Sequence, residues 1–245
     1  MEKEKIIKNC RKLLQAYKSG EIGQIKMPED SHPEFDDVET KLVYFTLPMS
    51  LNYQRDSYKL WEACLQSYKD DEVKQIFNIE NSSNLDEEKL REFLIKYKIA
   101  LQPNKHIDTW KRISQTVYSN WGSISNLIQE SNYDFLKLKE LVQVKHKKEF
   151  PYLSGPKIFN YWSFIIQEYG GIKLKNSEYI DIAPDTHITK GSVLLGIIDE
   201  KENLTKEEIS KRWRELLKDS GINPIEMHPP LWFWSRNNFM FKLEE

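Results

Sequence analysis

Apolar residues recur at helical spacing along almost the whole chain. Near the start, Ile6, Leu13 and Tyr17 fall on one face of a helix. The same spacing predicts further helices over residues 38–47, 105–120, 123–131, 133–144, 157–169 and 205–217, with a last helix from about 224. No alternation of apolar and polar residues exceeds four positions, and the chain has no Asn-Gly or Asp-Gly hairpin signal. The pattern therefore predicts an all-α protein.

Prolines, glycines and capping residues divide these helices. We expect the buried helix over 38–47 to end near Pro48, because proline has no N–H to continue the hydrogen-bond ladder. Pro151 and the Ser-Gly-Pro stretch at 154–156 predict a sharp break. Thr205, with a glutamate three residues later, predicts a capping box at the start of a helix.

The length and composition are those of a globular protein. The chain has 245 residues, of which 39% are hydrophobic and 30% charged. This length can bury a core without staples, and it fits one large domain or two closely packed lobes. No repeat or low-complexity linker interrupts the chain, so we expect a single domain over residues 1–245. No apolar run approaches 18 residues and the start is charged, so we expect a cytoplasmic protein with no membrane partner.

Candidate metal ligands are scattered. The two cysteines, Cys10 and Cys64, lack metal-ligand spacing and are expected to be ordinary buried thiols. None of the five histidines shares a short metal-binding spacing with another. We therefore expect no metal and no cofactor.

The charge balance limits the kind of nucleic-acid binding that is possible. A net charge of −2 argues against a strongly basic, histone-like binder, although a local basic face is enough to neutralise phosphates. Only seven of the 36 basic residues are arginines, the side chains that read bases in a bidentate manner. If the protein binds DNA, we expect it to read the backbone and one extruded base.

The most informative region is about 150–198. It contains Leu-Ser-Gly-Pro-Lys at 153–157, Pro-Asp-Thr-His-Ile at 184–188 and Leu-Leu-Gly-Ile-Ile at 194–198. A tight turn containing glycine thus leads into a helix that begins with Lys157. One helix and one loop later, Asp185 opens a second helix.

These residues resemble the helix-hairpin-helix DNA glycosylases, in which a lysine follows a glycine-rich hairpin and an aspartate lies in a Val-Asp-Thr-His-type segment. The hairpin here is shorter than the usual Leu-Pro-Gly-x-Gly form, and the 28 residues from Lys157 to Asp185 exceed the spacing in most members. In both of these features the chain is more similar to the archaeal 8-oxoguanine (GO) DNA glycosylase family. The likeness includes residues 219–224, Leu231, Trp232 and Arg236, and loosely residues 32–35 and Trp61.

The resemblance implies an all-α, two-lobed helix-hairpin-helix glycosylase fold with the active site between the lobes. It also implies that the partner is double-stranded DNA with one flipped nucleotide, bound by a monomer. The activity would be DNA N-glycosylase with an associated lyase step at abasic sites. The first-choice substrate is 8-oxoguanine.

The chemistry of base excision suits the two central residues. Breaking an N-glycosidic bond builds positive charge on the deoxyribose, and a carboxylate such as that of Asp185 would stabilise it. If Lys157 is held in an apolar pocket, its pKa falls and the neutral amine can attack C1′; the Schiff base formed would then permit β-elimination of the 3′ phosphate.

Base recognition rests on the resemblance alone. It implies that Trp61 and Trp232 stack on the flipped base, which must leave the duplex before cleavage. The family reads the base edge with a glutamine and an aspartate, and Glu34 and His228 stand at the matching positions. These two departures also allow another substrate, such as a hypermodified cytosine of phage DNA, in which case the enzyme would act in antiviral defence.

Phosphate contacts are expected around the hairpin. The backbone N–H of Gly155 and those after it would hold a DNA phosphate. Lys147 and Lys148, in the basic run just before the hairpin, are candidates for the same role, with a solvated face as the alternative.

Each of these residues also has a simpler interpretation. Taken singly, Lys157 fits a solvated first-turn lysine, Asp185 fits a helix N-cap, and Trp232 fits a core residue. Two other functions remain open at this point. One is a non-catalytic DNA-binding protein that kept the hairpin, and the other is a hydrolase of a modified nucleoside outside DNA.

Overall fold

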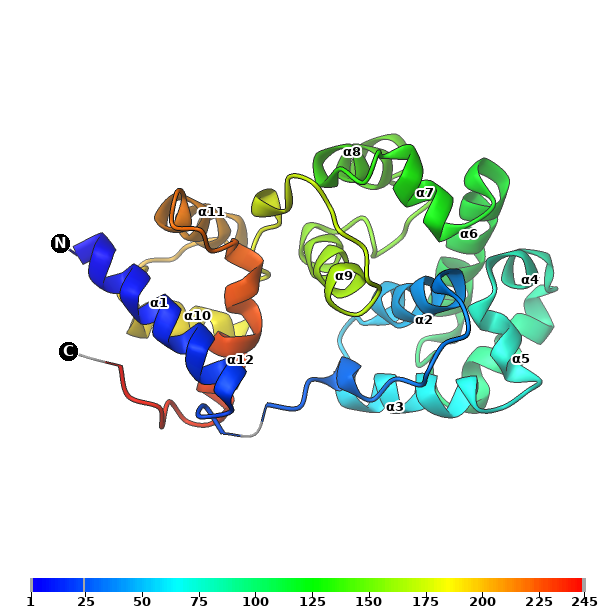
Figure 1. The fold of residues 1–245 in the computed structure, drawn as a ribbon. Coiled ribbons are helices and arrows are strands. Elements are labelled where there is room, and N and C mark those ends of the chain that lie inside the picture. The colour runs from blue at the N-terminus through cyan, green and yellow to red at the C-terminus, as the bar shows by residue number, and fades with distance from the viewer. Residues whose placement is uncertain (1, 24, 244–245) are drawn as a thin grey trace. The chain divides into compact units, whose positions relative to one another are not determined.

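The computed structural model describes residues 2–23 and 25–243. Within these residues every regular element is a helix, and one isolated β-bridge pairs Asp134 with Lys175. The chain is therefore all-α, as predicted (Figure 1). The α-helices are α1 (Glu2–Ser19), α2 (Val38–Leu51), α3 (Ser57–Tyr68), α4 (Ile79–Asn84), α5 (Glu87–Lys96), α6 (Pro103–Trp121), α7 (Ile124–Glu130), α8 (Phe135–Lys139), α9 (Pro156–Glu168), α10 (Thr186–Leu194), α11 (Lys206–Leu217) and α12 (His228–Arg236). The short helical turns are η1 (Pro28–Asp30), η2 (Val73–Phe77), η3 (Glu140–Lys145), η4 (Ser177–Tyr179) and η5 (Pro224–Met227), of which η3 is π-helical.

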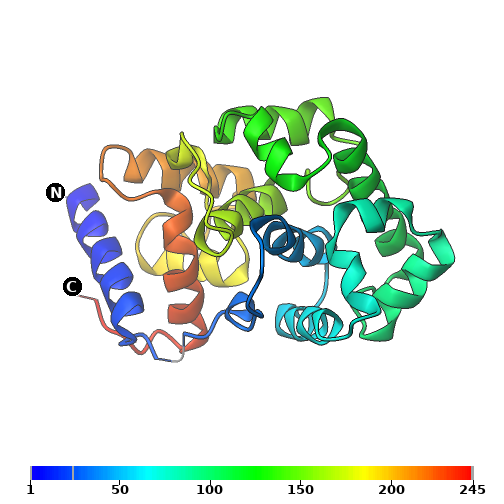
Figure 2. The same ribbon diagram turned by 45° about the vertical axis from the view of Figure 1, so that its right-hand side comes forward.

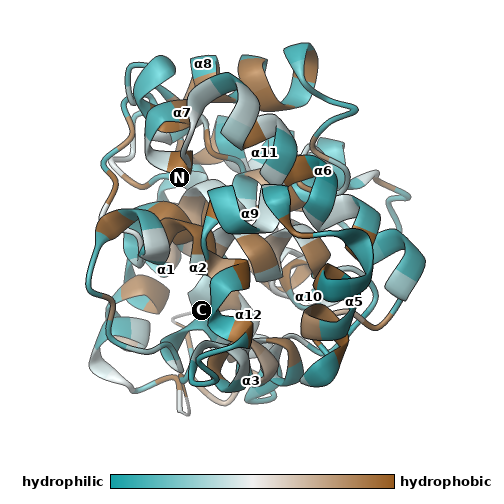
Figure 3. Cartoon of the chain, turned by 90° about the vertical axis from the view of Figure 1, so that its right-hand side faces the viewer, coloured by the Kyte–Doolittle hydropathy of each residue, from teal (hydrophilic) through white to brown (hydrophobic). Residues whose placement is uncertain are grey.

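The chain divides into two compact units. The terminal unit comprises the described residues of 1–27 and 176–245, and the central unit comprises residues 28–175. Helix α1 contacts α11 and α12, so the terminal unit joins the two ends of the chain. Most helices carry both hydrophilic and hydrophobic bands, as helices with one buried face do (Figure 3).

Helix α2 forms the core of the central unit. Its residues from Leu42 to Leu51 are all buried, so it is apolar on every side rather than along one stripe. It contacts α3, α6, α7 and α9, and Figure 2 shows it beside α9. A buried hydrogen bond of 3.0 Å from Trp162 Nε1 to Thr46 Oγ1 joins α9 to α2. This packing gives the start of α9 a rigid support.

Close contact between α10 and α12 organises the terminal unit. A Cβ atom at Gly191 would lie 2.9 Å from Leu231 Cδ2, so the absence of a side chain lets the two helices approach. Trp213 Nε1 on α11 donates a buried hydrogen bond of 2.8 Å to Ser192 Oγ on α10. These contacts hold α10, whose N-cap is Asp185, against α11 and α12.

Most predicted helices in the central unit are confirmed within a few residues, with two local differences. The helix expected over 133–144 begins later, because Asn132 and Tyr133 both have φ of 55° and Asp134 caps the backbone N–H groups of Leu136 and Lys137. It is also shorter in α-helical form, since α8 passes into the π-helical turn η3. π-Helical turns are uncommon, and this one leads directly into the predicted hairpin.

The expected end near Pro48 was wrong. Helix α2 continues to Leu51, with Pro48 inside it. Met49 and Leu51 are buried, and leaving the helix there would put backbone polar groups into the core without partners. In the terminal unit, the capping box at Thr205 and Glu208 is confirmed. The last predicted helix is divided into η5 and α12.

Candidate functional site

The predicted hairpin is a compact turn over residues 146–155, between η3 and α9. Its backbone closes on itself through hydrogen bonds from Phe150 N to His146 O (3.2 Å) and from Ser154 N to Phe150 O (2.9 Å). Side chains add two more, from Gln143 Nε2 to Ser154 O (2.8 Å) and from Ser154 Oγ to Lys147 O (3.0 Å). The turn is therefore a fixed element that presents Lys147 at its surface.

Gly155 occupies a position with little space. Its N–H donates to Tyr152 O at 2.9 Å, and a Cβ atom added there would lie 3.0 Å from the same oxygen. Because this N–H is already engaged, the backbone donors that follow are those of Lys157 and Ile158, since Pro156 has none. They precede the first helical hydrogen bond of α9, from Phe159 N to Gly155 O. The backbone donors that could hold a phosphate therefore begin at Lys157 rather than at Gly155.

Lys157 lies in the first turn of α9, and its side chain is exposed rather than held in the apolar pocket that a neutral amine was expected to need. Pro156 at the first helical position sets the backbone of this turn. Asn160 and Tyr161 follow Lys157 by three and four residues, so all three lie on one face of α9. Lys148 is exposed as well, on the preceding turn.

A buried acid that the sequence did not single out lies in the same unit. Glu29, in η1, is only 1% exposed. Burial raises the pKa of Glu29 to about 7, against the opposing effects of its own backbone N–H and the Tyr161 side chain, while the neighbouring Asp30 adds to the rise. Oε2 of Glu29 and Nε1 of Trp61 are buried and have no hydrogen-bond partner within the described residues. Such atoms are rare in folded proteins, and the Trp61 side chain is among the groups that oppose the rise in the pKa of Glu29.

Trp61 and Glu34, both predicted to contact the base, differ in their surroundings. Trp61 is fully buried on α3, against Tyr44 and Phe45 at ring-centroid distances of 6.0 and 5.6 Å. Glu34 is exposed on the segment before α2, and no hydrogen bond or ion pair of its side chain occurs among the described residues. Helix α3 packs against η1, so Glu29, rather than Glu34, is the acid beside Trp61. The sequence signal around Glu29, an acid after Pro28, does not distinguish it from an exposed turn residue.

Asp185 caps the start of α10 in the terminal unit. Its Oδ1 accepts hydrogen bonds from His187 N (2.9 Å) and Ile188 N (3.0 Å). No hydrogen bond reaches its Oδ2 from any residue that the structure describes. The simpler interpretation of Asp185 as an N-cap is therefore confirmed, and one carboxylate oxygen stays available for other contacts.

Trp232 lies close to the same turn. It is half-buried on α12, and its ring meets that of His187 at 5.7 Å in a T-shaped arrangement. Nδ1 of His187 is 3.0 Å from Ser235 Oγ, which holds the imidazole against α12. The guanidinium carbon of Arg236 lies 4.5 Å from the centroid of the Trp232 ring. The terminal unit thus combines a carboxylate, an accessible aromatic ring and an exposed cation.

The other tryptophan of α12 and the last predicted site residue belong to the interior. Trp234 is 5% exposed and donates from Nε1 to Phe241 O at 2.8 Å, as expected of a core residue. His228, predicted to read the base edge, is the first residue of α12 and is 6% exposed. The predicted residues are divided between the units: Asp185, Trp232 and His228 lie in the terminal unit, and Lys157, Trp61, Glu34, Gly155, Lys147 and Lys148 in the central unit.

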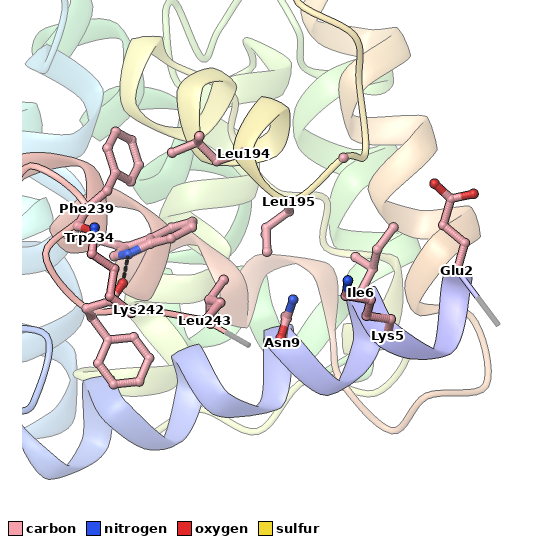
Figure 4. A pocket seen from close by; sticks show the side chains of 12 residues that line it. Glu2, Lys5, Ile6, Asn9, Leu194, Leu195, Trp234, Phe239, Lys242 and Leu243 are labelled. Carbon is pink, nitrogen blue, oxygen red and sulfur yellow. Dashed lines mark hydrogen bonds between the residues drawn. The ribbon is translucent and has the colours of Figure 1, made fainter. Parts of the chain in front are cut away.

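The terminal unit also contains a cavity of about 480 Å³. Figure 4 shows Ile6 from α1, Leu195 after α10 and Trp234 from α12 around it. Its remaining walls include charged side chains such as Lys5 and Lys242. None of the predicted site residues is among the described residues that line it.

The described residues contain neither a candidate metal cluster nor a candidate membrane-spanning helix. No group of three or more histidine, cysteine or acidic side chains that could hold a metal ion occurs in the described part of the chain. Cys10 and Cys64 are both buried free thiols, and burial raises the pKa of each, that of Cys10 to about 12. No described helix is long and apolar enough to cross a membrane.

Comparison of the chain with models of known protein families gives no match, and comparison with curated proteins gives none either.

Proposed function

We propose that the protein is a DNA N-glycosylase that removes a damaged or modified base from duplex DNA, with 8-oxoguanine as the first-choice substrate and a lyase step after base release. The observation that carries the proposal is the state of the Asp185 carboxylate. One of its oxygens is fixed by two backbone N–H groups, and the other has no hydrogen bond from the described residues. A carboxylate held in this way can face developing charge without reorganising.

Asp185 would stabilise the sugar. As the glycosidic bond breaks, positive charge grows at C1′ of the deoxyribose, and the Oδ2 atom would lie against it. The two capping hydrogen bonds fix the direction of the carboxylate group. Trp232 supports the assignment, because its half-buried ring lies against His187, two residues after Asp185, and could stack on an extruded base.

Lys157 would carry out the lyase step. An amine attacks C1′ only in its neutral form, and the Schiff base that follows permits loss of the 3′ phosphate by β-elimination. The turn at 146–155 followed by α9 supports the helix-hairpin-helix interpretation of this segment. The early N–H groups of α9 and the exposed Lys147 and Lys148 would hold the DNA backbone.

Glu29 is our preferred candidate for reading the base edge from the central unit. A neutral carboxyl group offers one O–H donor and one carbonyl acceptor, which is the hydrogen-bond pattern of the amide that the resembling family uses. Burial that raises the pKa of Glu29 to about 7 keeps it protonated in mildly acidic solution. This supports 8-oxoguanine over a base that needs two acceptors. Glu34 remains a prediction from the resemblance.

The proposal is tested with duplex oligonucleotides that contain a single 8-oxoguanine, in parallel with DNA from phages that carry modified cytosines. Released bases are identified by mass spectrometry, strand cleavage is followed on gels, and covalent adducts are trapped with borohydride. Release of a base from duplex DNA supports the proposal, and the released base identifies the substrate. Base release from free nucleosides alone, or DNA binding without release, would refute it.

A further inference from the structure

We propose that Tyr53 and Tyr152 form an aromatic platform that stacks on a nucleobase of duplex DNA next to the extruded nucleotide. This inference rests on the proposed function, which supplies the DNA partner. It assigns a DNA contact to a surface of the central unit that contains none of the predicted base-binding residues.

The two tyrosine rings are stacked and accessible. Their centroids are 5.3 Å apart and their planes differ by 28°. Tyr53 is 43% exposed and Tyr152 is half-buried. Neither hydroxyl makes a hydrogen bond to any described residue. A pair of rings in contact at the surface, without the polar contacts that usually hold tyrosine there, leaves apolar faces available for a partner.

Tyr53 is held by a rigid loop between α2 and α3. Arg55 donates to the carbonyl oxygens of Ile99 and, at 2.9 Å, of Lys98. Asn52 Nδ2 donates to Ser57 Oγ at 3.1 Å, which closes the loop across its base. Because the loop is anchored at both sides of Tyr53, little conformational entropy would be lost when the ring meets a base.

Tyr152 is held by the hairpin turn. Its φ is 59°, a left-handed conformation that is uncommon for an aromatic residue, and its carbonyl accepts the Gly155 N–H. This backbone conformation is therefore maintained by the turn. Strain retained at the surface of a fixed turn is typical of sites where a side chain must point in a particular direction.

The charge on the hairpin side of the platform fits nucleic acid. The hairpin turn carries the exposed Lys147 and Lys148, with Glu149 as its single acid, and Lys157 follows it. Flat aromatic faces beside lysines are the combination by which proteins bind bases and backbone together. A base next to an extruded nucleotide has lost a stacking partner, and an aromatic ring can replace it.

The test uses a duplex that contains a tetrahydrofuran abasic-site analogue with the fluorescent base 2-aminopurine beside it. Binding and fluorescence are measured for the wild type and for Tyr53→Ala, Tyr53→Phe and Tyr152→Asn, the last of which suits a left-handed backbone. Tyr179→Ala, which changes an exposed tyrosine of the terminal unit, is the matched control.

We expect Tyr53→Ala and Tyr152→Asn to weaken binding by roughly 5- to 150-fold and to lose the fluorescence change, as the loss of base stacking predicts. Tyr53→Phe and Tyr179→Ala should behave as the wild type. The dependence of binding on salt should stay unchanged in all variants, because no phosphate contact is removed. Wild-type binding and fluorescence by Tyr53→Ala and Tyr152→Asn would overturn the platform.

The same experiment separates this inference from the proposed function, because the abasic analogue is bound without base release. If the wild type binds it and the tyrosine variants do not, but no base is ever released, the platform stands and the glycosylase proposal fails. If bases are released and the tyrosine variants bind normally, only the platform fails. Absence of any DNA binding by the wild type would refute both.

Discussion

Replacing Glu29 with glutamine tests the buried carboxyl group directly. The side chain is 1% exposed, and burial raises its pKa from 4.5 to about 7. Since a tenfold change in an equilibrium corresponds to about 1.4 kcal/mol, ionising Glu29 in the folded protein costs about 3 kcal/mol. Glutamine has nearly the same shape and hydrogen-bonding groups as the neutral acid, but it cannot ionise.

The direction of the effect with pH follows from the two states. Below pH 4.5 Glu29 is protonated in both the folded and the unfolded chain and contributes no pH dependence. As the pH rises from 4.5 to about 7, the unfolded chain releases the proton while the folded protein retains it, so the free energy of unfolding falls. Above about pH 7 the full cost of ionising Glu29 in the folded protein lowers the free energy of unfolding. Glu29→Gln should therefore become progressively more stable than the wild type as the pH rises through this range.

The assay compares urea and thermal unfolding of the wild type and Glu29→Gln over a series of pH values, followed by far-ultraviolet circular dichroism. Titration of all other groups cancels in the difference between the two proteins. The difference in unfolding free energy should grow by about 3 kcal/mol, which for a chain of this size corresponds to roughly 6–12 °C in the melting temperature.

The matched control is Glu34→Gln, which makes the same change in the same part of the chain at an exposed position. It shows the effect of a glutamate-to-glutamine change without burial of the side chain. A pH-independent difference between Glu29→Gln and the wild type would refute the argument, because it would mean that Glu29 ionises in the folded protein as easily as in the unfolded chain.

Three further predictions concern the proposed catalytic residues and the packing of the central unit. Asp185→Asn should keep the cap and the stability, since asparagine also caps helices, but lower base release by roughly 10²- to 10³-fold. Asp86→Asn, at the cap of α5, controls for the change of residue, and normal base release by Asp185→Asn would contradict the assignment. Lys157→Ala should lose the borohydride-trapped adduct. The control Lys105→Ala, which changes another exposed lysine in a first turn after proline, should retain it. An adduct that persists in Lys157→Ala would exclude this lysine as the nucleophile. Gly170→Ala should lower the unfolding free energy by roughly 1–3 kcal/mol, because the added methyl group collides with the backbone carbonyl four residues earlier, and an unchanged denaturation midpoint would show that the turn can relax.

Local sequence signals predicted the helices well where capping and periodicity agree. Helix α9 follows its proline and glycine as expected, and Asp185 caps α10. The signals failed where tertiary packing overrides a local preference. A proline usually ends a helix, but the buried residues around Pro48 keep the chain helical to Leu51. The π-helical turn η3 likewise has no sequence signature, because its register depends on how α8 and the hairpin pack.

In the candidate site, too, some features follow from local sequence and others from tertiary packing. The sequence by itself determined that the protein is all-α, and it located the starts of α9 and α10 to within one residue, because turns, caps and periodicity depend on neighbouring residues along the chain. Only the tertiary structure decided that Glu29 is buried beside Trp61, and that Tyr53 meets Tyr152 at the surface. Burial and pairing across long loops depend on how helices pack, and packing determines both the pKa of an acid and the exposure of an aromatic ring.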